Sequence, residues 1–213
     1  IVGYTTIEME GGKWYQIGTP FVDLGDKEEV LLNEVFSSGF SEGDTLCIFD
    51  SESSAYTSYL YWIEDKGAWC DLPIPSLATP SMATLPFGQA VYIHKNTSGQ
   101  IVLSGKVEAK AITFGAEDVP VWAQIAPVWP VSCDVNDYAW EGLTQGDTLT
   151  VWDSDTSSYS AYAYWNETQH AWCDLPIPGI AKPISISLAP GQAVYISKQT
   201  GLATVKAPET ANN

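Results

Sequence analysis

Short runs in which apolar and polar residues alternate follow one another closely along this chain. The alternation predicts strands at residues 4–9, 13–21, 45–49, 56–63, 68–72, 89–94 and 101–107. Gly11 and Gly12 predict a turn that joins the first two strands as a hairpin. Residues 31–36 are the best candidate for a short helix. Strands this short and this closely spaced are typical of antiparallel all-β proteins.

The pattern occurs twice. When the chain is aligned with itself at an offset of 103 residues, about 30 of the 53 positions from Gly43 to Lys95 are identical, without a gap. The eight residues AWCDLPIP, for example, stand at 68–75 and again at 171–178. Further upstream, residues 14–17 (WYQI) match residues 122–125 (WAQI) at an offset of 108. A match of this length indicates an internal duplication.

The sequence therefore predicts two tandem homologous units, a first β unit at 1–107 and a second at 108–213. A unit of about 100 residues is large enough to have its own core. We expect each unit to be a small antiparallel β-barrel or sandwich with at most one short helix. Whether the two units pack as one body is left open by the sequence.

Aromatic residues give the most specific indication of a binding site. The stretch 56–63 is apolar or aromatic on both faces, so this strand is either covered on both sides or presents aromatic rings to solvent. Exposed Trp and Tyr rings stack on sugars and anchor protein interfaces, whereas buried ones fill a core. The candidates recur in both units: Tyr59, Tyr61, Trp62, Trp69, Tyr162, Tyr164, Trp165 and Trp172.

Charge narrows the choice of partners. The formal net charge is −17, with nine Lys and Arg residues together, all of them Lys. Nucleic acids are contacted mainly through Lys and Arg, so we expect no nucleic-acid partner. No apolar run approaches the roughly 18 residues that span a bilayer, so we expect no membrane insertion. A glycan or an extracellular protein remains as the expected partner, and the oligomeric state stays open.

Catalytic motifs are weak. Gly39-Phe40-Ser41-Glu42-Gly43 matches the G-x-S-x-G elbow of hydrolases, but a strand follows it where a helix is required. His94 and His170 stand at non-equivalent places of the two units. Carboxylate pairs such as those of glycosidases would have to come from Asp50, Glu64 and Asp71 and their counterparts Asp153, Glu167 and Asp174. We expect no enzyme activity and no cofactor.

Two further kinds of site are considered. Asp50, Glu52, Asp153 and Asp155 are weak candidates for a Ca²⁺ site, against the alternative that they form solvated hairpin turns. Cys47, Cys70, Cys133 and Cys173 are candidates for disulfides, as Cys47–Cys70 with Cys133–Cys173 or as Cys70–Cys173. Free buried thiols are the alternative.

Several motifs together resemble a family of secreted or surface proteins of Verrucomicrobia and Lentisphaerae bacteria. They are the Val2-Gly3-Tyr4 opening, the WYQIGTPF stretch at 14–21, LNEVF at 32–36, the GDTL pieces, the aromatic hairpins that end in Trp, and the GQAVYI strands. The second unit lacks the Gly-Tyr opening. The resemblance covers nearly the whole chain and implies an all-β unit and export by a cleaved signal. It implies no established activity.

The sequence thus predicts a non-catalytic binding or structural module, secreted or attached to the cell envelope, whose signal peptide has been removed. The chain begins at Ile1 rather than Met, which suggests either a removed signal segment or a sequence that has been shortened, and the sequence does not distinguish the two. Two equivalent weak sites on one chain would gain avidity from each other. The alternative is a carbohydrate-binding or carbohydrate-active protein that uses exposed Trp and Tyr beside acidic residues.

Overall fold

The computed structural model describes residues 1–25 and 27–208, and this part of the chain is all-β. The strands of residues 1–107, here called the first half, are β1 (Val2–Met9), β2 (Trp14–Ile17), β3 (Glu29–Leu31), β4 (Thr45–Asp50), β5 (Ala55–Ile63), β6 (Ala68–Cys70), β7 (Thr84–Pro86), β8 (Val91–His94) and β9 (Gly99–Lys106). A single turn of α-helix, α1 (Leu32–Val35), confirms the short helix expected at 31–36, and η1 (Glu64–Lys66) is a 3₁₀ turn.

The second half is residues 108 onward, and its described part, residues 108–208, contains ten strands and the 3₁₀ turn η2 (Val135–Asp137). Its strands are β10 (Ile112–Ala116), β11 (Val121–Ile125), β12 (Cys133–Asp134), β13 (Ala139–Glu141), β14 (Thr148–Asp153), β15 (Ser158–Asn166), β16 (Ala171–Cys173), β17 (Ser187–Leu188), β18 (Val194–Lys198) and β19 (Gly201–Lys206). The alternation of the sequence predicted most first-half strands but missed β3 and β7, which have three residues each.

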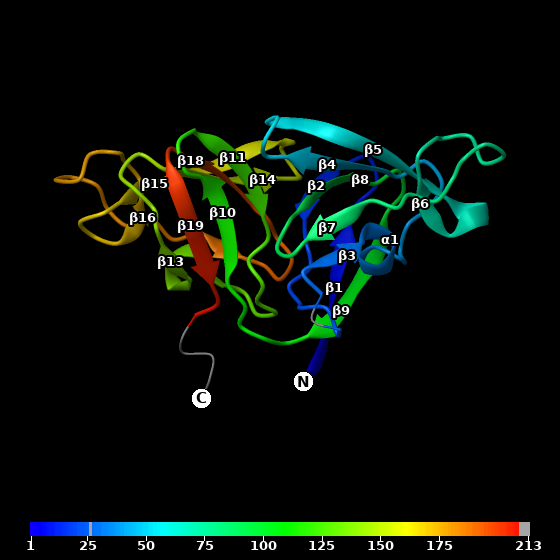
Figure 1. Cartoon of the computed structure of the whole chain (residues 1–213), viewed down its shortest axis with the longest axis horizontal. Coiled ribbons are helices and arrows are strands. Elements are labelled where there is room, and N and C mark those ends of the chain that lie inside the picture. The colour runs from blue at the N-terminus through cyan, green and yellow to red at the C-terminus, as the bar shows by residue number, and fades with distance from the viewer. Residues whose placement is uncertain (26, 209–213) are drawn as a thin grey trace.

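Each half is built on a five-stranded antiparallel sheet. The strand orders are β2-β8-β4-β5-β6 in the first half and β11-β18-β14-β15-β16 in the second. Smaller sheets accompany them: β1-β9 and β3-β7 in the first half, β10-β19-β13 and β12-β17 in the second. None of the sheets formed by the described residues closes into a barrel, so the barrel alternative is wrong. The elements are arranged in two lobes side by side (Figure 1).

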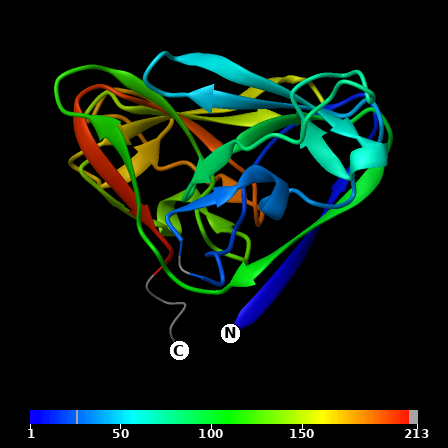
Figure 2. The ribbon, with the colours of Figure 1, turned by 45° about the vertical axis from the view of Figure 1, so that its right-hand side comes forward.

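The expected hairpin of the first two strands does not form. Gly11 and Gly12 do turn the chain, but β1 pairs with β9 and β2 pairs with β8. Figure 2 shows β1 and β9 side by side along one edge of the molecule. A turn signal fixes where the chain reverses, whereas long-range burial decides which strands pair. β1 and β2 therefore belong to different sheets of the same half.

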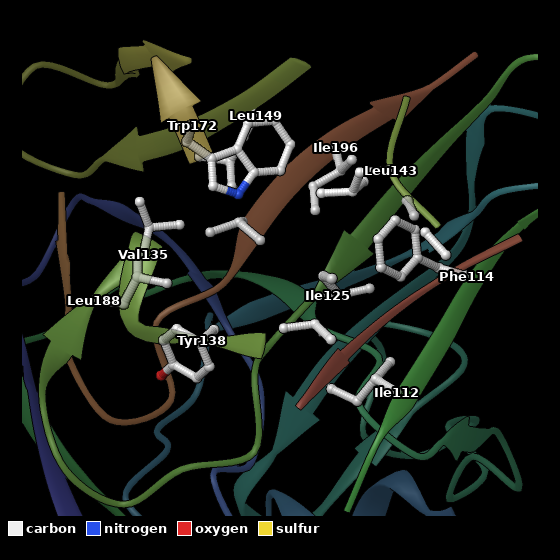
Figure 3. Packing of buried hydrophobic residues seen from close by; sticks show 14 of the residues in the cluster. Ile112, Phe114, Ile125, Val135, Tyr138, Leu143, Leu149, Trp172, Leu188 and Ile196 are labelled. Atoms are coloured by element: carbon white, nitrogen blue, oxygen red, sulfur yellow. The ribbon is translucent and has the colours of Figure 1, made fainter. Parts of the chain in front are cut away.

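Two hydrophobic cores lie between the five-stranded sheets and the smaller sheets. The first-half core brings together residues such as Leu46 and Ile93 of the large sheet with Leu103 of β9. In the second half, Leu149 and Ile196 of the large sheet meet Ile112 and Phe114 of β10 (Figure 3). Each lobe therefore consists of several antiparallel sheets packed around a hydrophobic core.

The two halves are joined by backbone hydrogen bonds. The Gly18 N–H donates to the Gly191 carbonyl at 2.9 Å, and the Ala126 N–H donates to the Gly88 carbonyl at 2.9 Å. The joint is tight, because a Cβ on Gly18 would lie 2.5 Å from the Cβ of Ala126. Buried Ala90, Ala126 and Ala193 form a small cluster there. The halves therefore form one continuous body.

Aromatic rings reinforce this junction. Phe49 contacts Tyr195, and Tyr92 contacts Trp152, with ring centroids 5.3 and 5.0 Å apart. The indole N–H of Trp152 donates to the Trp14 carbonyl across the junction at 2.8 Å. Burial raises the pKa of Tyr195 to about 12, as expected for a phenol withdrawn from water.

A buried ion pair stands at the same place in each half. Lys95 pairs with Asp44, and Lys198 pairs with Asp147 at 3.0 Å, with all four side chains at most 1% exposed. Asp147 also accepts hydrogen bonds from the backbone N–H groups of Thr144 and Gln199. The Gly-Asp-Thr-Leu motif thus supplies a carboxylate that ties the start of the central strand to the end of the neighbouring one.

Candidate functional site

The predicted aromatic platform divides into core and surface residues. Trp62, Trp69, Trp165 and Trp172 are all buried, at most 6% exposed, so they are core residues and the prediction that they form a platform is wrong. Their side chains follow the inward face of the sheet, where a small fold needs bulky apolar groups. By contrast, Tyr59 and Tyr162 are 58% and 61% exposed, while Tyr61 and Tyr164 are half-buried.

The Trp of the AWCDLPIP motif is held by an asparagine. Asn33 accepts a hydrogen bond from the Trp69 N–H at 2.7 Å and donates to the Trp69 and Ser81 carbonyls. Asn136 makes the same three contacts in the second half, around Trp172. The asparagine therefore bridges two chain segments that a loop separates, and it fixes both ends of that loop.

The loop itself is built by the rest of the motif. A carboxylate oxygen of Asp71 accepts from the Thr79 N–H at 2.8 Å, and Asp174 accepts from the Lys182 N–H at 2.8 Å. These bonds close a compact turn at residues 71–80 and at 174–183. The carboxylates Asp71 and Asp174 are therefore structural, and the prolines end β6 and β16 because proline cannot donate to a ladder.

Each loop presents three aliphatic side chains to solvent. They are 41–65% exposed: Leu72, Ile74 and Leu77 in the first loop, and Leu175, Ile177 and Ile180 in the second. We call these two sets the apolar loops. They lie beyond β6 and β16, at opposite ends of the long axis of the molecule (Figure 1). Sequence reasoning missed them, although the identity of AWCDLPIP in both halves was the available signal.

The acidic hairpin turns are structural. Asp50 accepts hydrogen bonds from the Glu52 N–H and the Ser53 hydroxyl, and these bonds lower the pKa of its carboxyl. Asp153 is held in the same way by Asp155 N–H and Thr156, with the same effect on its pKa. Among the described residues, no group of three or more His, Cys, Asp and Glu side chains is arranged to hold a metal ion.

The other catalytic candidates lie in separate places and do not form a common site. The Ser41 hydroxyl bonds to the Thr97 hydroxyl at 2.6 Å, in a turn closed by Asp44, which fits a structural role for the G-x-S-x-G stretch. His94 lies beside the ring of Trp14, and His170 lies exposed in the turn between β15 and β16. Glu64 and Glu167 are exposed residues directly after β5 and β15.

All four cysteines are free thiols, so the predicted disulfides are wrong. Cys47 lies on β4 and Cys70 on β6, with β5 between them. Two strand spacings come to about 9.6 Å, which is beyond the reach of a disulfide. Cys133 and Cys173 belong to different sheets. Cys70 is on β6 and Cys173 is on β16, and these two strands lie at opposite ends of the molecule (Figure 1).

Burial makes these thiols unreactive. It raises the pKa of Cys47 to about 11, and it also raises the pKa of Cys70, Cys133 and Cys173. Because the thiolate is the nucleophile, we expect slow alkylation of the native protein by iodoacetamide at pH 8. Cys133, the one of the four that is not fully buried, should react first. Peptide mass mapping would check this order, and rapid labelling of Cys47 would contradict it.

A cleft of about 540 Å³ lies at the junction of the halves. It is lined by the β4–β5 turn, by all of β10 from Ile112 to Ala116, and by Val121 and Ala123 of β11. A volume of this size is typical of ligand sites. The site residues named from the sequence include only Asp50 and Glu52 among its lining.

Comparisons of the chain with models of protein families, with curated proteins and with solved structures find no match. No helix among the described residues is both long and apolar enough to cross a membrane.

Proposed function

We propose that this chain is a non-catalytic, bivalent binding module of a secreted or envelope-associated protein, and that the two apolar loops are its contact sites. In this proposal the halves are copies of one unit, each of which contributes one loop. The observation that carries it is the exposure of Leu72, Ile74 and Leu77 together with that of their counterparts at offset 103.

A folding role accounts for part of the loop sequence only. Asp71 closes the turn, the prolines end the strand, and Trp69 belongs to the core. Leu72 and Ile74 do none of these things, yet the same residues stand at positions 175 and 177. Aliphatic side chains held at the tip of a rigid turn favour a protein surface with apolar pockets as the partner.

Two apolar loops on one rigid body would bind a repeating partner more tightly than one loop alone. The backbone bonds and aromatic contacts at the junction hold the halves together, so the loops keep a fixed separation. A partner that repeats at a matching spacing would engage both loops, and the second contact would then be intramolecular. Gains of about 10²- to 10⁴-fold over one loop are ordinary for such an arrangement.

A second candidate function, glycan binding, is favoured by one observation. Tyr59 and Tyr162 are exposed at equivalent positions on β5 and β15, where a phenol ring is available for stacking on a sugar. A Tyr59→Ala/Tyr162→Ala variant separates this candidate from the first, because these substitutions leave the apolar loops unchanged.

The test is a combined array of extracellular proteins and glycans, probed with the wild type and two loop variants. One variant carries Leu72→Ser, Ile74→Ser and Leu77→Ser, and the other also carries the three matching changes in the second loop. We expect protein spots that weaken with one altered loop and disappear with two. Protein spots that persist when both loops are altered would overturn the proposal, and glycan spots lost in the tyrosine variant would favour the second candidate.

A further inference from the structure

The cleft at the junction lies where two sheets of the second half end. β10 is the end strand of its sheet and pairs only with β19 among the described strands, and β11 is the end strand of the five-stranded sheet. β11 is covered at its far end only, where the Gln124 carbonyl accepts from the Ala90 N–H. The chain thus leaves a gap between β10 and the start of β11, and this gap is the cleft of about 540 Å³.

The corresponding gap of the first half is partly filled by side chains and ion pairs. The Tyr15 hydroxyl accepts a hydrogen bond from the Glu10 N–H at 2.6 Å, and Lys13 pairs with both Glu10 and Asp155 at 2.6 Å. The Trp152 indole caps the Trp14 carbonyl on the edge of β2. A cleft of about 460 Å³ remains there, but its lining is acidic, with Glu8, Glu10, Asp153 and Asp155.

Three residue differences distinguish the gap of the second half from that of the first. At offset 108, Ala123 stands where the first half has Tyr15, and Val121 stands where it has Lys13. At offset 103, Phe49 stands where the second half has Trp152, and a phenyl ring has no N–H to donate. The space-filling ring, the ion pairs and the indole cap are therefore all missing from the second gap.

We propose that this gap binds an extended, cationic peptide segment, which adds as a strand to the open edge of β10. A sheet edge offers a row of unpaired N–H and C=O groups, and strand addition satisfies them. The five residues of β10 span about 16 Å, which matches a peptide of about five residues. This site is separate from the apolar loops.

Charge and polarity select the peptide. Pro86 is exposed and Phe87 is half-buried in the lining, so the peptide meets an apolar wall and every second peptide side chain should be apolar. Asp50 and Glu52 stand on its wall, and one cation, the Lys110 ammonium, lies 4.5 Å from the ring of Phe87 in the lining. Glu117 and Asp118 are exposed directly after β10. The remaining side chains of the peptide should therefore be Lys or Arg.

The test is a titration of the ¹⁵N-labelled protein with a capped seven-residue peptide that alternates Lys and Val. We expect chemical-shift changes centred on Ile112–Ala116, slower hydrogen exchange of the edge amides of β10, and binding that weakens as salt is raised. A Glu-Val peptide should not bind. A Lys-Val peptide N-methylated at alternate residues, on the edge facing β10, should bind at least tenfold more weakly.

Ala123→Tyr, which places the first-half ring in the gap, should abolish binding, while Ala123→Ser should bind as the wild type does. The variant with both apolar loops altered should also bind this peptide normally. The experiment therefore tests the peptide site separately from the proposal that the apolar loops bind a partner. The inference is overturned if the Lys-Val peptide causes no shifts in β10 at millimolar concentration. It is also overturned if Ala123→Tyr or N-methylation leaves the affinity unchanged.

Discussion

Replacing Lys198 by Met is expected to lower the free energy of unfolding by about 3–5 kcal/mol, because it leaves the Asp147 carboxylate buried without its cation. Asp147 is fully buried and lies 3.0 Å from the Lys198 ammonium. The backbone N–H groups of Thr144 and Gln199 would still donate to it, but they do not neutralise its charge. Urea denaturation monitored by Trp fluorescence measures the loss.

Two further variants separate burial from charge. Lys27→Met removes an exposed pair with Glu34 at 3.5 Å and should cost less than about 1 kcal/mol. Asp147→Asn combined with Lys198→Met removes both charges and should cost less than the sum of the two single changes. Equal losses for Lys198→Met and Lys27→Met would show that the buried pair adds nothing beyond a surface pair.

Replacing Trp69 or Trp172 by Ala should lower the free energy of unfolding by about 3–5 kcal/mol in each case, because each indole fills the centre of a core. Both side chains are fully buried. Trp172 packs with Leu149 in the second half (Figure 3), and Trp69 packs with Phe40 and Trp62 in the first. Thermal and urea unfolding of both variants check the prediction.

The Phe variants of the same two residues distinguish the halves. The Trp69 indole N–H donates to the Phe36 carbonyl at 2.9 Å, whereas the Trp172 indole N–H is buried and has no hydrogen-bond partner among the residues that the structure describes. Trp69→Phe therefore leaves a buried carbonyl unsatisfied, while Trp172→Phe removes an unsatisfied donor. We expect Trp69→Phe to cost about 1–3 kcal/mol more than Trp172→Phe. The opposite order would contradict the assigned hydrogen bonds.

Local sequence patterns predicted the elements better than their pairing. The alternation around Tyr56–Ile63 identified a strand, and LNEV at 32–35 identified a helix. The Gly11-Gly12 turn suggested a hairpin of β1 and β2. That hairpin is absent, because β1 pairs instead with β9, which follows about 90 residues later in the chain. Pairing at that distance depends on which faces must be buried together, and alternation within one strand does not encode this.

The site was less predictable than the fold for a similar reason. The aromatic residues were found from the sequence, but Trp62 and Tyr59 lie on opposite faces of β5, and only the assembled sheets decide which face is covered. Leu72 and Ile74 look like core residues in a sequence. Their exposure follows from the Asp71 turn and the neighbouring prolines, which hold them away from both cores.

The cleft at the junction also could not be predicted from the sequence. Its lining comes from β4 and from β10 and β11, which follow more than 60 residues later in the chain. Its shape depends on Ala123, which stands where the first half has the ring of Tyr15. Alignment of the two halves displays that difference. The consequence becomes visible only when the junction places the β4–β5 turn beside β10.

The central claim is that one rigid chain carries two equivalent binding loops. The most direct test measures the dissociation of this chain from an array-identified partner immobilised at high and at low density. We predict that dissociation of the wild type slows by at least tenfold on the dense surface, and that the variant with one altered loop dissociates at the same rate on both. A wild-type rate that does not depend on density, or a one-loop variant as slow as the wild type, would contradict the claim.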